Sequence, residues 1–332
     1  MQNAEFDVVV IGGGHAGAEA AWAAANALGA DGKVALVTMD PAKIGVMSCN
    51  PAIGGLAKGQ MVREIDALGG LMGLATDATG ILFKMLNTSK GAAVRGPRAQ
   101  CDKYAYSAEV QRLISTRENM AVIAGTVDEI VVEDGKVAGV RLPAGSRVVC
   151  ADREQADRNV RNEGLARAIY RADGTMNSGA SAGGWMIRTK AVVLTTGTFM
   201  RALMHTGEQK TEGGRVNEGS AVGISGALRG MGFALGRLKT GTPPRLARES
   251  IDWENLPMQR GDEPAVAFSD LSPGALPREK FPQMPQAECR MSRTTAEIHE
   301  VIKANIHRAP MYSGQIDAEC GPRYCPSIED KV

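Results

Sequence analysis

Aromatic residues are scarce in this chain, and neither sign of charge is in clear excess. Phe, Trp and Tyr make up 4% of the 332 residues, so base stacking on aromatic side chains gives no strong signal for nucleic-acid binding. The 38 Lys and Arg residues face 37 Asp and Glu residues, and the formal net charge is +1. This balance excludes a global basic signature, and any contact with nucleic acid requires a local patch.

Cysteines are also few, and long apolar runs are missing. Six cysteines in a chain of 332 residues are too few for a disulfide framework. Cys320 and Cys325 lack the number and spacing of a structural zinc site, so we predict no metal. The N-terminus carries neither a charged leader nor an apolar run of membrane-spanning length, which predicts no signal peptide and no membrane span. We expect a reducing compartment, the cytosol.

Glycine, by contrast, is abundant. The chain has 40 glycines, which cluster in pairs and triplets rather than in repeats, and this favours tight turns and close approach of the backbone to a ligand. A hydrophobic content of 44% and a charged content of 23% are typical of a globular protein. The length predicts one large domain and one smaller domain.

A glycine-rich turn follows the first predicted strand. The strand covers Phe6 to Ile11, and an alanine-rich helix is expected over Ala18 to Leu28. The turn between them consists of Gly12, Gly13, Gly14, His15, Ala16 and Gly17. Strand, glycine turn and helix are the context of the dinucleotide-binding fingerprint. We expect Gly12 to make the tight turn, Gly14 to admit a pyrophosphate, and Gly17 to let the helix pack on the strand.

The next predicted strand, Lys33 to Thr38, is followed by Asp40. An acidic residue at the end of this strand holds the ribose in many dinucleotide-binding folds. Asp40 lies late for that role and precedes Pro41, so an aspartate that forms the turn is an equal alternative.

Cys49 lies in a loop of small and turn-forming residues, Met47 to Lys58. A free cysteine is commonly a small buried hydrophobe. A thiol near a cation or a helix N-terminus is instead a better nucleophile, and Lys58 is expected to begin a helix that runs to about Leu68. Both interpretations stay open from the residues alone.

Several long segments, taken in order, resemble one family. They are Gly12–Gly17, Met47–Gly55, Arg237–Arg245 and Gly321–Lys331. The family is the flavoprotein subunit of the tRNA wobble-uridine 5-carboxymethylaminomethyl modification enzyme, the MnmG or GidA family. The resemblance implies an α/β fold, with a Rossmann-like FAD-binding domain of the glutathione-reductase type and an inserted smaller α/β domain that is NAD-binding-like. We expect the FAD-binding domain over 1–200 and the second domain, incomplete, over 201–332.

The resemblance also implies roles for individual residues. Cys49 and Cys289 are the expected catalytic thiols, and the glycine turn and the backbone of Val127 are expected to bind FAD. The segment expected to bind NADH consists of Gly321, Pro322, Arg323, Tyr324, Cys325, Pro326, Ser327, Ile328, Glu329, Asp330 and Lys331.

The sequence departs from the family pattern in three places. Residues from about 150 to 184 are expected to form an inserted surface loop, partly disordered. Glu212 stands where the family has a serine that contacts the flavin, so that contact is not carried over. Arg290 and Arg293 replace an aromatic residue and a histidine after Cys289.

The resemblance implies that the substrate is tRNA, that NADH and methylene-tetrahydrofolate are used with FAD, and that the partner is the GTPase MnmE. Family members resemble homodimers that join the GTPase in a heterotetramer. The family continues for roughly as long again, so the chain is identified as the N-terminal part of such a protein. One alternative is a folate- and FAD-dependent tRNA uracil methyltransferase. Another is a truncated, non-catalytic fragment that binds flavin.

Three further expectations concern local structure. A basic cluster is expected to bind RNA phosphates or to be merely solvated, and it consists of Lys84, Lys90, Arg95, Arg98 and Lys103. A helix is expected over Asn217 to Arg229. The proline-rich stretch from Asp252 to Gln286 is expected on the surface of the smaller domain.

Overall fold

The computed structural model describes residues 4–151, 170–171, 184–272, 281–316 and 328–332. They form two compact units. Unit 1 comprises the described residues of Met1–Met47, Pro51–Gly197 and Gly261–Ala287. Unit 2 comprises those of Ser48–Asn50, Thr198–Arg260 and Glu288–Val332. The predicted domain boundary at residue 200 stays a prediction.

Within the described residues, unit 1 is built on an eight-stranded sheet. Its strands, in spatial order, are β10 (Tyr170–Arg171), β9 (Arg147–Ala151), β6 (Met120–Ala124), β2 (Val34–Thr38), β1 (Ala4–Ile11), β11 (Trp185–Leu194), β8 (Lys136–Leu142) and β7 (Glu129–Glu133). β6, β2, β1 and β11 run parallel, and β9 and β8 pair antiparallel at their flanks. The second half of β1, Val8 to Ile11, and β2 up to Val37 are apolar and rich in valine, as expected for parallel strands covered on both faces.

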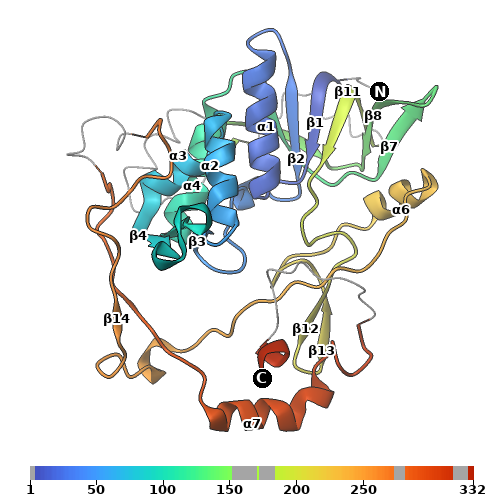
Figure 1. Ribbon diagram of the computed structural model, residues 1–332. Coiled ribbons are helices and arrows are strands. Elements are labelled where there is room, and N and C mark those ends of the chain that lie inside the picture. Colours follow the sequence, from blue (N-terminus) through green and yellow to red (C-terminus); the bar gives the residue numbers. More distant parts are fainter. Residues whose placement is uncertain (1–3, 152–169, 172–183, 273–280, 317–327) are drawn as a thin grey trace. The chain divides into compact units, whose positions relative to one another are not determined.

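Helices and a smaller sheet complete unit 1 (Figure 1). The helices are α1 (His15–Leu28), α2 (Lys58–Ala67), α3 (Met72–Thr79) and α4 (Lys103–Ser115), with short 3₁₀ turns η1 (Pro41–Lys43), η2 (Thr88–Lys90) and η3 (Ala92–Val94). The smaller sheet has the order β3 (Ala52–Gly54), β5 (Gly96–Cys101), β4 (Gly80–Leu86). β7 and β8 pair antiparallel as a hairpin. The predicted α/β, Rossmann-like fold class is confirmed.

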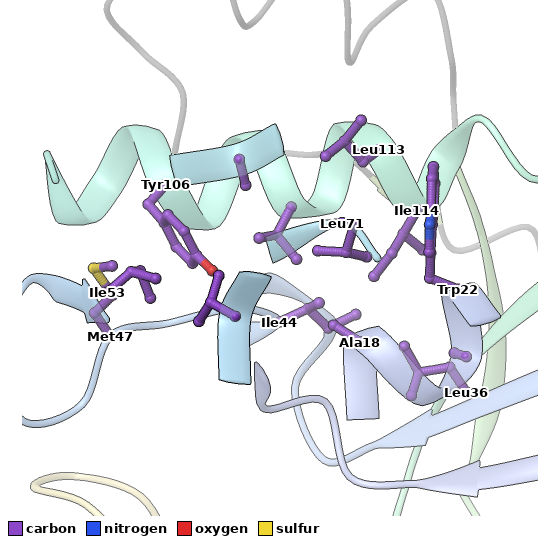
Figure 2. Close-up of a cluster of buried hydrophobic side chains, with 14 of the residues drawn as sticks. Ala18, Trp22, Leu36, Ile44, Met47, Ile53, Leu71, Tyr106, Leu113 and Ile114 are labelled. Carbon is purple, nitrogen blue, oxygen red and sulfur yellow. The ribbon is translucent and has the colours of Figure 1, made fainter. Parts of the chain in front are cut away.

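The core of unit 1 lies between α1, α4 and the sheet (Figure 2). Trp22 of α1 is buried, and its indole N–H donates to the Gly69 carbonyl at 2.8 Å. Leu36 of β2 and Ile114 of α4 are buried in the same cluster. Burying each large apolar side chain of this kind stabilises the fold by about 1.5–3 kcal/mol. This packing fixes α1, and with it the glycine turn that precedes it.

The proline-rich stretch from Asp252 to Gln286 was expected on the surface of the smaller domain, and part of it lies in unit 1 instead. The described residues of Gly261–Ala287 belong to unit 1, where Phe268 is buried in the core cluster. The buried carboxylate of Asp77 accepts the backbone N–H groups of Phe268 at 2.7 Å and Ser269 at 2.8 Å. The expectation is therefore wrong for this segment, because one buried aromatic ring and one buried acid hold it on unit 1.

Unit 2 contains short elements. They are β12 (Leu203–Thr206), β13 (Gln209–Glu212), α6 (Gly223–Gly230), η4 (Arg248–Ser250), β14 (Met258–Gln259), β15 (Cys289–Arg290), α7 (Ala296–Asn305), η6 (Ile306–Arg308) and η7 (Ile328–Lys331). β12 pairs with β13, and β14 pairs with β15. The helix expected from Asn217 begins only at Gly223, and Asn217 has a left-handed φ of 63°, which is incompatible with a right-handed helix. The N-cap residue of α7 is Thr295, whose hydroxyl accepts from the Ile298 N–H.

Parts of two predictions lie outside the described residues. They are the insertion, apart from the backbones of β9 and β10, and the segment Gly321–Ser327. Among the helices in the described ranges, none combines the length and the apolarity required to cross a bilayer.

Candidate functional site

The glycine turn lies where several parallel strands end. The Thr195 amide, just after β11, donates to the carbonyl of Ile11 at the end of β1 over 2.8 Å. The Gly125 amide, just after β6, donates to the carbonyl of Thr38 at the end of β2, also over 2.8 Å. These bonds join the loops that leave four neighbouring strands. In open α/β sheets, ligands bind at the carboxyl ends of such strands.

The glycines of the turn have different surroundings. A Cβ atom on Gly12, where φ is 113°, would lie 2.2 Å from the Thr195 carbonyl oxygen. A Cβ on Gly17 would lie 1.7 Å from the Gly12 carbonyl oxygen. A Cβ on Gly14 would meet nothing within 4 Å in the described structure. Gly12 and Gly17 are thus required for packing, whereas Gly14 faces open space, as a residue beside a pyrophosphate must.

The N-terminus of α1 is suited to an anion. Gly14 is the N-cap residue and has no side chain to satisfy the first N–H groups of the helix. The backbone N–H groups at a helix N-terminus and the positive end of the helix dipole favour a phosphate at this position. His15 begins the helix, and its ring packs on the buried ring of Tyr106 with a centroid distance of 5.5 Å. The turn therefore fits the pyrophosphate of a dinucleotide such as FAD.

Residues of α4 support the neighbouring loop. The Gln111 amide donates to the carbonyls of Ala42 at 3.1 Å and Ile44 at 3.0 Å. The Ser107 hydroxyl donates to the same Ile44 carbonyl at 2.7 Å. One residue further, the Gly45 amide donates to the Gly13 carbonyl at 3.1 Å. The helix thus fixes the loop that follows β2 against the glycine turn.

Asp40 has a structural role in this loop. Its carboxylate accepts the Ala42 N–H at 2.9 Å and caps the 3₁₀ turn η1. Of the two interpretations left open by the sequence, the structure shows the aspartate that forms the turn.

Val127 lies in the loop between β6 and β7. Its side chain is buried, and the adjacent Asp128 N–H donates to the Arg141 carbonyl at 2.9 Å. The backbone contact with FAD expected for Val127 stays a prediction.

Cys49 is half-buried in unit 2, and its thiol is free. The thiol donates to the Gly241 carbonyl over 3.5 Å, and the Arg245 guanidinium donates to the Cys49 carbonyl at 2.7 Å. The structure therefore brings together two segments that carried the family resemblance, although 192 residues separate Cys49 from Gly241.

Cys289 is also half-buried and free, and it lies in β15 opposite Gln259 of β14. The ribbon is extended by a bond from the Met291 N–H to the Pro257 carbonyl at 2.9 Å. Cys49 bonds to Gly241 and Arg245, whereas Cys289 pairs with Gln259 in β14. A third free thiol, Cys101, is buried in unit 1, where desolvation raises its pKa to about 12.

Of the segment expected to bind NADH, Ile328–Lys331 forms the 3₁₀ turn η7, and the Asp330 carboxylate accepts the Tyr312 hydroxyl. The basic cluster is partly paired, because Lys84 forms an ion pair with Asp262 at 3.3 Å. The Lys103 ammonium lies over the ring of Tyr104 at 4.7 Å.

Sequence reasoning missed the role of Thr195. Its hydroxyl donates to the Ile11 carbonyl at 2.8 Å and lies 3.2 Å from the Gly12 carbonyl oxygen. It thereby fixes the first glycine of the turn. The only signal was its place at the end of an apolar run, Ala191 to Leu194.

A parallel sheet with a glycine turn at the carboxyl ends of its strands defines a Rossmann-type dinucleotide-binding protein. The family described as glucose inhibited division protein A matches residues 7–152 and 162–332. The chain belongs to this family, and the resemblance found in the sequence is confirmed.

Relatives and solved structures agree with this assignment. The chain is 49% identical over 328 residues to the tRNA uridine 5-carboxymethylaminomethyl modification enzyme MnmG of Rhodopirellula baltica, covering 99% of this chain and 44% of that protein. It is 45% identical over 332 residues to MnmG of Granulibacter bethesdensis, covering 99% and 45%. GidA of Aquifex aeolicus in its form I crystal has a TM-score of 0.76 at 42% identity, covering 99% of this chain and 47% of that chain. The chain thus spans somewhat less than half the length of these proteins.

Proposed function

We propose that this chain supplies the flavin-binding part of an enzyme that modifies tRNA at carbon 5 of the wobble uridine. The added group is aminomethyl or carboxymethylaminomethyl, the co-substrates are NADH and methylene-tetrahydrofolate, and the partner is an MnmE-type GTPase. The working assembly is a homodimer within a heterotetramer in the cytosol. Family membership and the printed names of the relatives support the proposal.

The observation that carries the proposal is the glycine turn. Its open position at Gly14 and the uncapped N-terminus of α1 fit the pyrophosphate of FAD. The backbone N–H groups of Gly13 to Gly17 would hold the phosphates, and the backbone of Val127 would contact the flavin nucleotide. NADH would bind at Gly321–Lys331. The bound flavin supplies the redox chemistry and the transfer of the one-carbon unit.

The thiols carry the chemistry on the uracil ring. Carbon 5 of uracil is a poor nucleophile, and a thiolate that forms a C–S bond at carbon 6 converts the ring to an enolate that is nucleophilic at carbon 5. After carbon 5 has attacked the one-carbon electrophile, a base removes its proton and the C–S bond breaks, which restores the ring and the thiolate. Cys49 and Cys289 fill these two roles, and each is chemically suited to either.

Nucleoside analysis of the product tests the proposal. The natural gene product, with its GTPase partner, is incubated with unmodified tRNA, FAD, NADH and methylene-tetrahydrofolate, and the digested tRNA is analysed by mass spectrometry. We expect an aminomethyl derivative at the wobble uridine. Methyluridine would instead identify the folate-dependent methyltransferase alternative. Unmodified tRNA with FAD bound would identify the non-catalytic alternative.

A further inference from the structure

A pocket in unit 2 lies beside the strand that carries Cys289. Its volume is about 510 Å³. It is lined by Leu246, Arg248, Ile251, Trp253, Glu288 and Arg290. We propose that this pocket binds a nucleotide of the RNA substrate, with the base on the Trp253 ring and the phosphate on Arg248 and Arg290. The inference rests on the proposed function, and it adds a binding site that the family resemblance did not assign.

Trp253 provides a platform for a base. Its indole N–H donates to the Arg248 carbonyl at 3.0 Å, so its one polar atom is satisfied within its own turn. The residue is nevertheless 41% exposed, and it lines the pocket. An indole at this position suits a base, because bases stack on aromatic rings regardless of their sequence.

The charge of the pocket favours a phosphate. Glu288 already pairs with Arg260, at 3.3 Å, and its negative charge is thereby offset. The Arg290 guanidinium donates one bond to the Leu256 carbonyl at 3.2 Å, which leaves most of its five N–H donors for a ligand. With Arg248 also in the lining, the pocket has a positive balance, and arginine is well suited to bind phosphate oxygens.

The pocket and the thiol face different sides of the ribbon. Cys289 and Arg290 are successive residues of β15, and successive side chains of a strand point to opposite faces. The pocket that Arg290 lines therefore takes a nucleotide other than the uridine that Cys289 would engage. A second nucleotide held in this way would fix the register of the RNA on unit 2.

Tryptophan fluorescence and RNA binding together test this proposal. The natural gene product is titrated with a uridine-rich anticodon stem-loop RNA and, separately, with free uridine monophosphate, while indole emission is recorded. We expect the RNA to quench the emission, and the Trp253→Phe variant to lose this quenching while it keeps its affinity. Trp253→Ala should weaken RNA binding about tenfold, within the range measured for loss of base stacking. The double variant Arg248→Ala/Arg290→Ala should weaken RNA binding further and reduce the salt dependence of the affinity.

Arg293→Ala is the matched control, since Arg293 is exposed, carries the same charge and does not line the pocket. We expect it to change the affinity less than twofold. Quenching by uridine monophosphate as well as by RNA would show that the pocket recognises the nucleotide itself, whereas quenching by RNA alone would show that the chain context is required. No quenching by either ligand, or an equal loss of affinity in Arg293→Ala and Arg290→Ala, would overturn the proposal.

The same preparations separate this inference from the proposed function. If the wild-type protein modifies tRNA but Trp253→Ala binds RNA normally, only the pocket inference fails. If the wild-type protein does not modify tRNA, the proposed function fails, while the quenching by uridine monophosphate still reports on the pocket.

Discussion

The two units hold their functional groups in different ways. In unit 1 the glycine turn joins strands whose central residues, such as Val9 and Val10, are fully buried. In unit 2 the helix α7 buries none of its residues, and its apolar Ile298 and Val301 are 45% and 64% exposed. Regions with few buried apolar contacts open locally at a lower free energy. The comparison teaches that the dinucleotide turn is prebuilt, whereas the segments that carry the thiols are held by a few hydrogen bonds.

The largest expected effect comes from removing the two candidate catalytic thiols, Cys49 and Cys289, which belong to unit 2. Cys49→Ser and Cys289→Ser should each lower the rate of tRNA modification on the order of 10³-fold or more, because a hydroxyl does not replace the thiolate as nucleophile or as base. FAD binding should be unchanged, since the glycine turn lies in unit 1. Modification rates and FAD titration measure both effects. A variant that modifies tRNA at the normal rate would remove that cysteine from the mechanism.

Thiol reactivity compares the units directly. Burial raises the pKa of Cys101 in unit 1 to about 12, so at pH 8 only about one in 10⁴ of its thiols is ionised. We expect iodoacetamide at pH 8 to modify the half-buried Cys49 and Cys289 at least about a hundredfold faster than Cys101. Peptide mass spectrometry over time measures the three rates. Comparable rates for Cys101 would show that unit 1 opens as readily as unit 2.

Gly17→Ala should disrupt the turn of unit 1. The added Cβ would lie 1.7 Å from the Gly12 carbonyl oxygen, and the backbone must shift to admit it. We expect a loss of about 3 kcal/mol in the free energy of unfolding and loss of FAD binding. Urea unfolding and FAD titration measure the two effects.

Gly14→Ala is the matched control for this variant. Its φ of −73° suits alanine, and its Cβ would meet nothing within 4 Å in the described structure. The free energy of unfolding should stay within about 0.5 kcal/mol of wild type, while FAD affinity falls about tenfold because the methyl group obstructs the pyrophosphate. Normal affinity in Gly14→Ala would place the cofactor elsewhere.

Asp77→Asn tests how Gly261–Ala287 is held on unit 1. The amide group would place an N–H₂ opposite one of two backbone N–H donors, and we expect a cost of about 2 kcal/mol in the free energy of unfolding. Asp270→Asn, whose exposed carboxylate pairs with Arg63 at 3.0 Å, should cost less than about 1 kcal/mol. Equal costs in urea unfolding would show that the buried acid does not anchor the segment.

The pH dependence of the Asp77→Asn cost has a definite sign. Burial raises the pKa of Asp77 above its ordinary value of 3.8, so the folded state binds this proton more tightly than the unfolded state. The stability that the protonated group contributes is lost as pH rises from about 3.8 through the folded pKa. The difference between wild type and Asp77→Asn should therefore shrink over that window, and a difference that grows with pH would contradict the raised pKa.

The parts that were predicted from the sequence are local. The glycine turn and its strand and helix are contiguous, and their residue types dictate the backbone that they form. The positions of Cys49 and Cys289 came from the family resemblance, and their roles stay predictions.

The parts that were missed depend on residues far apart in the chain. Gly261–Ala287 has no periodicity, and the acid that holds it, Asp77, lies 191 residues before Phe268. The contact between Arg245 and Cys49 spans 196 residues. Nothing in the sequence around these residues indicates either contact. The early part of the helix expected from Asn217 was wrong for a local reason. A tight turn closed by the Glu218 N–H on the Arg215 carbonyl at 3.0 Å places Asn217 in a left-handed backbone, which asparagine tolerates.

The most direct measurement is a titration of the purified protein with FAD, followed by anaerobic addition of NADH while the flavin absorbance is recorded. The account predicts one FAD bound per chain, bleaching of the flavin absorbance on addition of NADH, and weaker binding in Gly14→Ala. Failure to bind FAD, or equal binding by wild type and Gly17→Ala, would contradict the claim that the glycine turn of unit 1 is the flavin site.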